Sequence, residues 1–358
     1  MLNQPAMDMA TDVAWRLPAE WEPQDAVMLA WPYDGSDWTP VLRYAQKTCA
    51  DIIAAARQFQ PVVLCVRSDD VLSEQSWTDS GGKHPVWIVV ADYDDTWVRD
   101  TGPLTVMDSN GKPAWANFRF DGWGGRSHHP LDTTLTSRLS ESSLFDAVPV
   151  HNYDYVLEGG AIESDGAGTL LTTTRCWRAR DAQFSRSAVE LQLAQHLGAQ
   201  RVLWLNHGEL LGDDTDSHVD MLARFAPEDT LIYQGCQLPQ DPHYPFLQAM
   251  ARELESFRTL SEQPYRLLEL PMPTVMGKGA YRCPVTYANF MVLNNAVLVP
   301  TFEDSATDEQ AIRVIGTAFP ERQVLGVDSR VLITQGGALH CASLQLPSGT
   351  LNVSTPAG

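Results

Sequence analysis

The sequence predicts an α/β fold. Short β-type runs and amphipathic helical windows alternate from one end of the 358-residue chain to the other. No Ser/Gly-rich linker or block of charge divides it, so we expect one domain spanning residues 1–358. A hydrophobic fraction of 44%, with 11 Trp, 11 Phe and 10 Tyr, is ample for a large core and excludes general disorder.

The first predicted helix covers residues 44–58, because its apolar side chains fall on one face. These are Ala45, Cys49, Ile52, Ile53 and Ala56. The helix leads into a strand at 62–66. Further strands are predicted at 86–90, 114–118, 169–173, 201–205, 266–270 and 323–326, further helices at 185–197, 245–258 and 308–318, and a hairpin within 287–300.

Segments that carry reactive side chains recur along the chain. WVRD ends at Asp100, LEGG contains Glu158, HVD begins at His218 and LHC ends at Cys341. The intervals are 58, 60 and 123 residues, and the last is about twice the others. Five equal units would be ~72 residues long. This length suits a ring of ββαβ modules in which each module contributes one segment near a common axis.

Charge and composition restrict the partners. Lys and Arg total 25 against 45 Asp and Glu, which gives a net charge of -20. Such an acidic surface repels phosphate backbones, so nucleic acid is excluded as a partner and a small cation is favoured. No apolar run approaches the roughly 18 residues of a membrane span, so no membrane partner is expected. A homo-oligomer is compatible with the sequence but not predicted by it.

The termini and cysteines indicate a cytoplasmic protein. The first 16 residues show no basic segment followed by an apolar one, so they do not form a secretory signal. Six cysteines without a CxxC pair predict neither a disulfide scaffold nor a zinc site. We therefore expect reduced thiols.

The segment Gly336–Cys341, GGALHC, carries a candidate nucleophile. Two glycines permit close approach of a ligand to the backbone before a thiol that we place at the end of a strand-like stretch. The competing interpretation is a buried cysteine that only fills space. Cys49 and Cys65 fit that interpretation, and we expect every cysteine except Cys341 to be dispensable for chemistry.

A second candidate is the acidic segment Asp213–Asp220. His218 and Asp220 are two residues apart, so on an extended strand they would face one substrate together. Imidazole beside carboxylates suits general acid and base catalysis. The alternatives are a solvated acidic turn and a metal site.

The metal alternative has a specific form. Asp216, His218 and Asp220 match the DxHxD pattern of the dimanganese ureohydrolases, in which carboxylates and imidazole hold two metals. That family also needs a GGDHS-like segment and an SxDxDxxDP motif, and the sequence contains neither.

Two further segments contain candidate binding residues. In Asp92–Pro103, an aromatic residue next to Arg99 and Asp100 suggests a pocket wall in which Asp100 binds a planar cation. Glu158 precedes two glycines, which suggests either a reactive carboxylate or a structural bulge.

Taken together and in order, these segments resemble the agmatine deiminase and bacterial peptidylarginine deiminase family of guanidino-group hydrolases, within the pentein superfamily. The resemblance begins at LPAEWEPQDAVMLAWP and covers nearly the whole chain. It continues through WVRDTGP, NFRFDGWGG, LEGG, GDDTDSHVD, YANF and GGALHC. The family implies a five-bladed α/β propeller of ββαβ modules with pseudo-fivefold symmetry.

The resemblance also assigns roles to individual residues. It implies that Cys341 is the nucleophile, His218 the general acid and base, and Glu158 the carboxylate that orients this histidine. Asp100 and Asp220 would bind the guanidinium, and Trp97 would line the pocket. These roles require neither a cofactor nor a metal. The implied reaction is hydrolysis of a C–N bond of a linear amidine through a covalent thiouronium on cysteine.

Agmatine is the substrate that the resemblance favours, giving N-carbamoylputrescine and ammonia in putrescine and polyamine metabolism. Three departures from the commonest pattern affect the choice of substrate tail: Asp94–Thr96, Ala161–Glu163 and Ala338. Free or peptidyl arginine and other alkylguanidines are therefore alternatives. A dimetal ureohydrolase and a non-catalytic guanidine-binding protein are more distant ones.

Overall fold

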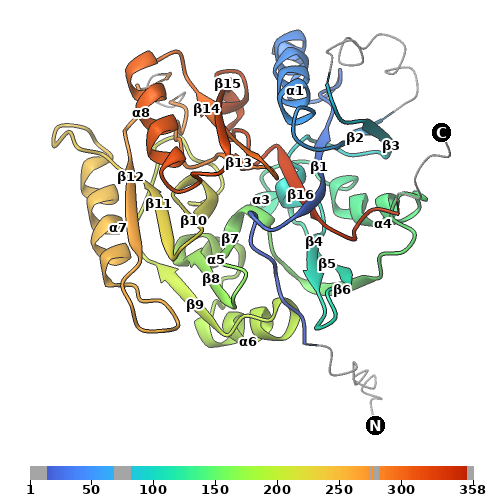
Figure 1. The fold of residues 1–358 in the computed structure, drawn as a ribbon, viewed down its shortest axis with the longest axis horizontal. Coiled ribbons are helices and arrows are strands. Elements are labelled where there is room, and N and C mark those ends of the chain that lie inside the picture. The colour runs from blue at the N-terminus through green and yellow to red at the C-terminus, as the bar shows by residue number, and fades with distance from the viewer. Residues whose placement is uncertain (1–13, 68–81, 275, 278–281, 353–358) are drawn as a thin grey trace.

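Five small sheets organise the computed structural model, which describes residues 14–67, 82–274, 276–277 and 282–352. Four sheets have three strands and one has four, and they follow one another around the molecule in chain order (Figure 1). Residues 1–13, most of the N-terminal segment discussed above, lie outside the described residues. Within the described part of the chain, no helix is both long and apolar enough to cross a membrane.

The three-stranded sheets share one connection pattern. In each, an antiparallel pair of strands is followed by helical structure and then by a strand parallel to the second. An example is β10 (Ala223–Ala226), β11 (Thr230–Gln234), α7 (Tyr244–Ser256) and β12 (Arg266–Leu270). The second such sheet comprises β4 (Leu104–Met107), β5 (Pro113–Arg119), α3 (Gly122–Gly125), α4 (Leu135–Ser140) and β6 (Val150–Val156). The third comprises β7 (Ile162–Ser164), β8 (Thr169–Thr173), α5 (Thr174–Arg180), α6 (Arg186–Leu197) and β9 (Arg201–Leu205). The fourth comprises β13 (Met291–Val292), β14 (Ala296–Thr301), α8 (Ser305–Gly316) and β15 (Gln323–Asp328).

The fifth sheet joins the two ends of the fold. Strand β1 (Gln24–Ala30) pairs antiparallel with β16 (Ser343–Pro347) and parallel with β2 (Val62–Val66). Helix α1 (Leu42–Ala56) connects β1 to β2, and β3 (Val86–Val90) adds a parallel edge strand. Because β16 begins two residues after Cys341, this pairing fixes the C-terminal segment against the N-terminal one.

The predicted helices and strands are confirmed. All five apolar residues expected on one face of α1 are buried, and α6 ends at Gly198, which adopts a left-handed φ of 72°. The elements that the sequence did not predict are mostly short or polar. Strand β6, for example, reads VHNYDYV and is only partly buried.

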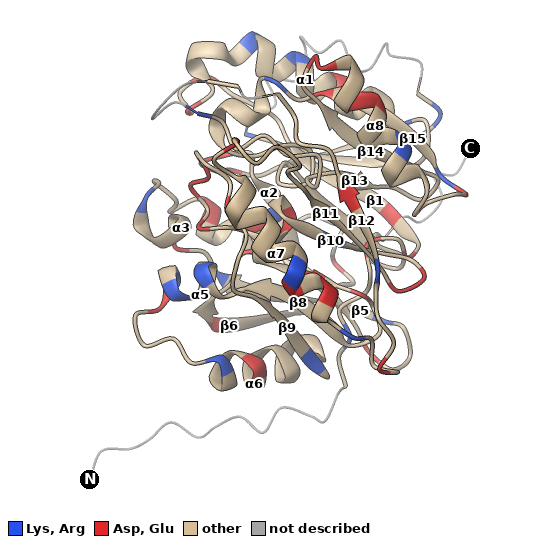
Figure 2. Ribbon diagram, turned by 90° about the vertical axis from the view of Figure 1, so that its left-hand side faces the viewer, with Lys and Arg blue, Asp and Glu red and all other residues tan. Residues whose placement is uncertain are grey.

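Three short helices and a turn carry the residues of interest. They are α2 (Val98–Thr101), the 3-10 helices η5 (Gly159–Ala161) and η6 (Val219–Met221), and the turn between the 3-10 helix η8 (Leu332–Gln335) and β16. The main hydrophobic core extends to them, since Trp97, Val219 and Cys341 belong to the same buried cluster as α1. Acidic residues are spread over helices and loops on the outside of this framework (Figure 2).

Candidate active site

The structure brings together the six residues singled out from the sequence. They come from α2, the start of η5, η6 and the turn before β16. None is more than 6% exposed. Cys341, Trp97 and Asp100 also line a cavity of about 400 Å³. The sequence therefore identified a cluster that forms in three dimensions, although its members are up to 244 residues apart (341 − 97).

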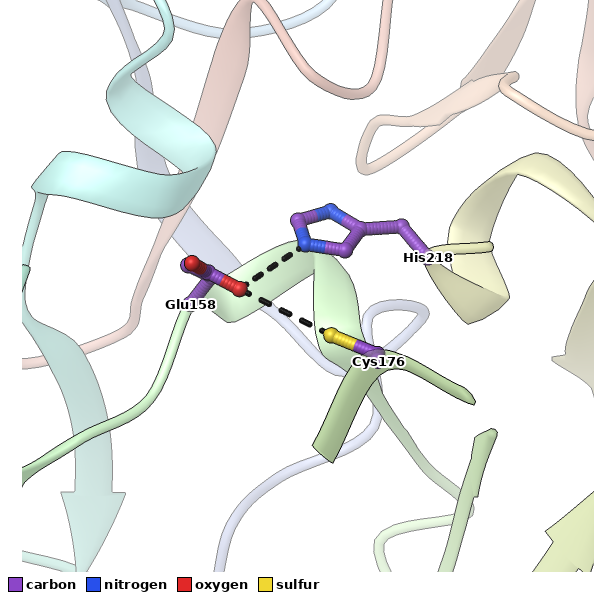
Figure 3. A group of neighbouring side chains, drawn as sticks. All are labelled: Glu158, Cys176 and His218. Atoms are coloured by element: carbon purple, nitrogen blue, oxygen red, sulfur yellow. Dashed lines mark hydrogen bonds and ion pairs between the residues drawn. The ribbon is translucent and has the colours of Figure 1, made fainter. Parts of the chain in front are cut away.

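His218 lies between two carboxylates. Its Nε2 contacts Oε2 of Glu158 (Figure 3) at a distance of 3.0 Å, and its Nδ1 is 3.7 Å from Oδ1 of Asp100. An ionised Glu158 only accepts hydrogen bonds, so Nε2 carries the proton in this pair. The nitrogen that remains available for proton transfer is Nδ1.

The two carboxylates expected to bind a cation are held differently. Asp100 accepts hydrogen bonds from the Gly160 amide (2.9 Å) and from the Trp123 indole (3.0 Å). Asp220 is 2.7 Å through Oδ2 from Nδ1 of His340. Within the described chain, Oδ1 of Asp220 and Nδ1 of His218 are buried without a hydrogen-bond partner. Because buried polar atoms are normally paired, these two atoms indicate a ligand position.

Cys341 faces both a carboxylate and an amide. Its Sγ is 3.4 Å from Oδ2 of Asp220 and 3.1 Å from Nδ2 of Asn289. Asn289 Oδ1 in turn accepts the backbone N–H groups of Ala338, His340 and Cys341 at 3.0–3.2 Å. One asparagine therefore fixes the turn that presents the thiol.

Two local expectations were wrong. Cys341 does not end a strand but lies in a turn before β16, because the preceding backbone bonds to Asn289 instead of to a neighbouring strand. His218 and Asp220 are not on an extended strand either. Residues 219–221 form η6 with His218 as its N-cap, and the two side chains reach Glu158 and His340, respectively.

Burial and neighbouring charges act together on the pKa of the thiol but against each other on the pKa of the imidazole. Burial, reinforced by Asp220 and Asp100, raises the pKa of the Cys341 thiol well above its ordinary value. Burial alone would lower the pKa of His218, but Asp100, Cys176 and Glu158 outweigh it and raise the pKa well above the usual range. The resting site thus combines a neutral thiol with a readily protonated imidazole.

The two glycines after Glu158 allow the backbone to pack closely against the reactive side chains. A Cβ on Gly160 would lie 2.7 Å from Nδ1 of His218, 2.9 Å from Asp100 and 3.0 Å from Asp220. A Cβ on Gly159 would lie 2.1 Å from the carbonyl oxygen of Arg99. The two glycines therefore serve close packing of backbone against the reactive side chains, not a bulge in a strand.

Carboxylates dominate the lining of the cavity. Asp37, Asp95 and Asp214 surround it together with Asp100, and burial raises the pKa of Asp95 to about 7. Arg126 is the one basic side chain among the lining residues that the structure describes. It is already bonded to Asp216 (2.6 Å) and to the backbone oxygen of Asp214.

Several residues around the reactive groups were not predicted as site residues. Trp123 holds Asp100 although its own backbone is left-handed (φ 55°), a strain that non-glycine residues rarely accept. Asn289 and Trp123 lie in the YANF and FDGWGG segments, so the resemblance offered a signal for both. Cys176 and Arg180, which contact Glu158, gave no such signal.

Among the residues that the structure describes, two clusters contain ligand types that metals use. Glu158, Cys176 and His218 form one, and Glu20, Glu163 and His340 form the other, with ligand atoms within 4.8 Å in each. An arginine adjoins each cluster: Arg180 is bonded to Glu158, and Arg224 to Glu163 and Glu20. The positive charge of the guanidinium group opposes a cation at these positions.

Comparisons with known proteins place the chain among guanidino-group hydrolases. A family model described as Porphyromonas-type peptidyl-arginine deiminase matches residues 16–347. The agmatine deiminase of Stutzerimonas stutzeri is 30% identical, covering 93% of this chain and 95% of the relative.

Solved structures give the same grouping. A Cys-to-Ser variant of C. jejuni agmatine deiminase with substrate bound superposes with a TM-score of 0.86 at 30% identity, covering 96% of this chain and 99% of that chain. A Porphyromonas gingivalis protein provisionally described as an arginine deiminase gives a TM-score of 0.85 at 40% identity, covering 94% of this chain and 99% of the other.

Gly160→Ala should destabilise the fold, because the added methyl group would overlap three buried polar side chains. We expect a loss of about 1–3 kcal/mol in the free energy of unfolding, measured by urea denaturation. Gly316→Ala is the control, since its Cβ meets nothing closer than 3.7 Å and it ends helix α8. Equal stability of both variants would contradict the close packing inferred at Gly160.

Asp220→Asn should make Cys341 more reactive toward iodoacetamide at pH 7. Removing a negative charge next to Sγ lowers the pKa of the thiol and so enlarges its thiolate fraction, by about tenfold for each unit of pKa. Mass spectrometry of the modified peptide measures the rate. Asp154→Asn, which removes an exposed carboxylate that does not contact Cys341, should leave the rate unchanged, and a slower rate in Asp220→Asn would refute the electrostatic explanation.

Proposed function

The chain belongs to the Porphyromonas-type peptidyl-arginine deiminase family, and from this premise we propose that it hydrolyses agmatine to N-carbamoylputrescine and ammonia. The enzyme is then a hydrolase of a C–N bond in a linear amidine. The observation that carries this proposal is the pair of buried, unsatisfied atoms, Asp220 Oδ1 and His218 Nδ1, among the described residues around Cys341.

A guanidinium group matches the needs of this site. It is a planar cation with N–H donors on several sides, so it can bond to Asp100 and Asp220 at once and hold its carbon toward Sγ of Cys341. Its positive charge also offsets the two carboxylates that raise the pKa of the thiol. Substrate binding thereby favours the thiolate that must attack.

The reaction then proceeds in two halves. The Cys341 thiolate attacks the guanidinium carbon, His218 donates its Nδ1 proton to the departing nitrogen, the C–N bond breaks and ammonia leaves. An S-alkylthiouronium remains on Cys341. Water gives a proton to Nδ1 of His218 and attacks the same carbon. The C–S bond breaks, which releases the ureido product and restores the thiolate.

The outer part of the cavity supports agmatine as the substrate. The amine of agmatine would meet Asp37, Asp95 and Asp214 and favour their ionised forms, whereas the carboxylate of arginine would meet the same acidic groups without a cationic partner. None of the three arginines in or next to the WVRDTGP and NFRFDGWGG segments is available to a substrate carboxylate: Arg99 is buried and paired with Glu20. Arg119 pairs with Asp154 and does not line the cavity, and Arg126 is engaged by Asp216.

We also infer that the five sheets form a five-bladed α/β propeller and that the chain is a single deiminase domain. The repeated connection pattern and the succession of sheets in Figure 1 support this arrangement. Sheet pairing between β1 and β16 would complete the first blade from both ends of the chain.

The function is tested by incubating the purified protein with agmatine and measuring ammonia, urea and ureido product. We expect stoichiometric ammonia and N-carbamoylputrescine, no change after exhaustive chelation, and no turnover by a folded Cys341→Ala variant. Cys49→Ala is the matched control, since this thiol is buried in the core and should tolerate replacement. Urea together with recovery by manganese would indicate a ureohydrolase, and tight binding without product a binding protein.

Agmatine should be preferred over free arginine by about a hundredfold or more in kcat/KM, because placing an unpaired carboxylate in an acidic cavity costs several kcal/mol and each 1.4 kcal/mol is tenfold. Asp214→Asn should narrow this ratio. Parallel ammonia assays with agmatine, arginine and a peptide with C-terminal arginine measure it. Comparable specificity constants would show that the substrate assignment is wrong while the chemistry stands.

A further inference from the structure

Helix α5 contributes two buried side chains, Cys176 and Arg180, that contact Glu158 of the reactive cluster. Its last residue, Arg180, does not line the substrate cavity but borders a separate one of about 300 Å³ with Trp177 and Phe184. The guanidinium group is nevertheless buried, with the side chain 4% exposed. A buried arginine so close to the site, and without access to substrate, requires an explanation.

Two residues one helical turn apart on α5 contact the same carboxylate. Arg180 Nε donates to Oε1 of Glu158 at 2.6 Å, and Cys176 Sγ is 3.7 Å from Oε2. Figure 3 shows the thiol and the imidazole of His218 meeting at one oxygen. The i, i+4 spacing places both side chains on one face of the helix. Glu158 is therefore held on each oxygen.

Arg180 also binds the loop that leads into His218. Its Nη1 is 2.7 Å from Oδ2 of Asp216, and its Nη2 is 3.1 Å from the backbone oxygen of Thr215. Asp216 and Ser217 both have left-handed backbones, with φ of 63° and 66°. Such conformations are costly for residues other than glycine, so the loop depends on external contacts to keep its shape.

We propose that Arg180 is a positioning residue that joins Glu158 to the loop before His218 and so fixes the orientation and protonation of this histidine. The inference rests on the proposed function, in which His218 moves protons through Nδ1. Arg180 touches neither the substrate position nor Sγ of Cys341. It acts through Glu158 on one side and through Asp216 on the other.

The electrostatic consequence is a shift in the pH dependence. Burial by itself would raise the pKa of Glu158, but His218 and Arg180 outweigh it and hold the pKa below its ordinary value. Without Arg180, Glu158 would take up a proton at a higher pH and cease to hold the Nε2 proton of His218. Among the described residues, the titratable and charged groups that surround this pair are Asp100 of α2, Cys176 and Arg180 of α5, Asp214 and Asp216 of the loop and Asp220 of η6.

The test compares Arg180→Met and Arg180→Lys with the control Arg178→Met, which changes an exposed arginine on the same helix. For ammonia release from agmatine, we expect Arg180→Met to lower kcat by roughly ten- to hundredfold with a smaller change in KM. The acid limb of its kcat profile should move to higher pH. Arg180→Lys should keep the acid limb near that of wild type, and the control should match wild type throughout.

Two further measurements keep the inference separable from folding and from the proposed function. Asp216→Asn leaves Arg180 paired with Glu158 but weakens the contacts of the loop with Arg180 and Arg126, so it should lower kcat without moving the acid limb. The downfield proton resonance of the His218 Nε2–H group, assigned with a His218→Gln variant, should be lost or shifted in Arg180→Met and retained in the control. This resonance reports on positioning even if wild type releases no ammonia from agmatine. An unchanged resonance and pH profile in Arg180→Met would overturn the proposal.

Discussion

Three carboxyl groups lie out of water within one small volume, and many of the contacts around them compensate the cost of burying them. Asp100, Glu158 and Asp220 are each at most 6% exposed. Burying an ionised carboxylate is costly unless it is paired and hydrogen-bonded. Glu158 is paired with Arg180 and His218, Asp220 with His340, and Asp100 accepts an amide and an indole N–H. Among the described atoms of these residues and of His218, Oδ1 of Asp220 and Nδ1 of His218 have no hydrogen-bond partner, and a guanidinium substrate would lie next to both.

The arrangement of sheets explains how distant segments supply this cluster. Each reactive side chain is carried by a short helix or turn next to one of the small sheets. The thiol depends on long-range contacts more than the others do. Its turn is held by Asn289, and the strand that follows pairs with β1. The nucleophile Cys341 is thus positioned by Asn289, more than 50 residues away in sequence, and by β1, more than 300 residues away.

The sequence predicted the helices and strands with a regular apolar pattern and the motifs that are shared with the family. The apolar face of α1 and the glycine at the end of α6 follow from local physical rules, and both are confirmed. The ordered motifs led to the family, which the comparisons confirm. Local backbone at the site was predicted less well. The spacing of His218 and Asp220 suits a strand as readily as the observed 3-10 helix, because two polar residues cannot distinguish a period of two from a tight turn.

The residues that contact the reactive carboxylates without being reactive themselves could not be predicted from local sequence patterns. Arg180 acts on Glu158 across 22 residues and on Asp216 across 36, so no local pattern marks it. Cys176 was expected to be an ordinary core thiol, yet it contacts Glu158. The left-handed backbone of Trp123 would not be chosen by propensity and persists because its indole satisfies Asp100.

Mass spectrometry of the intact protein, quenched with acid during turnover of agmatine, tests the covalent chemistry most directly. Attack by Cys341 with loss of ammonia predicts a transient adduct of the alkylthiouronium mass, located by peptide mapping at Cys341 and at no other cysteine. Sustained ammonia release with no adduct at any quench time in a slowed variant such as His218→Gln, or an adduct at a different cysteine, would contradict the assignment of Cys341 as the nucleophile.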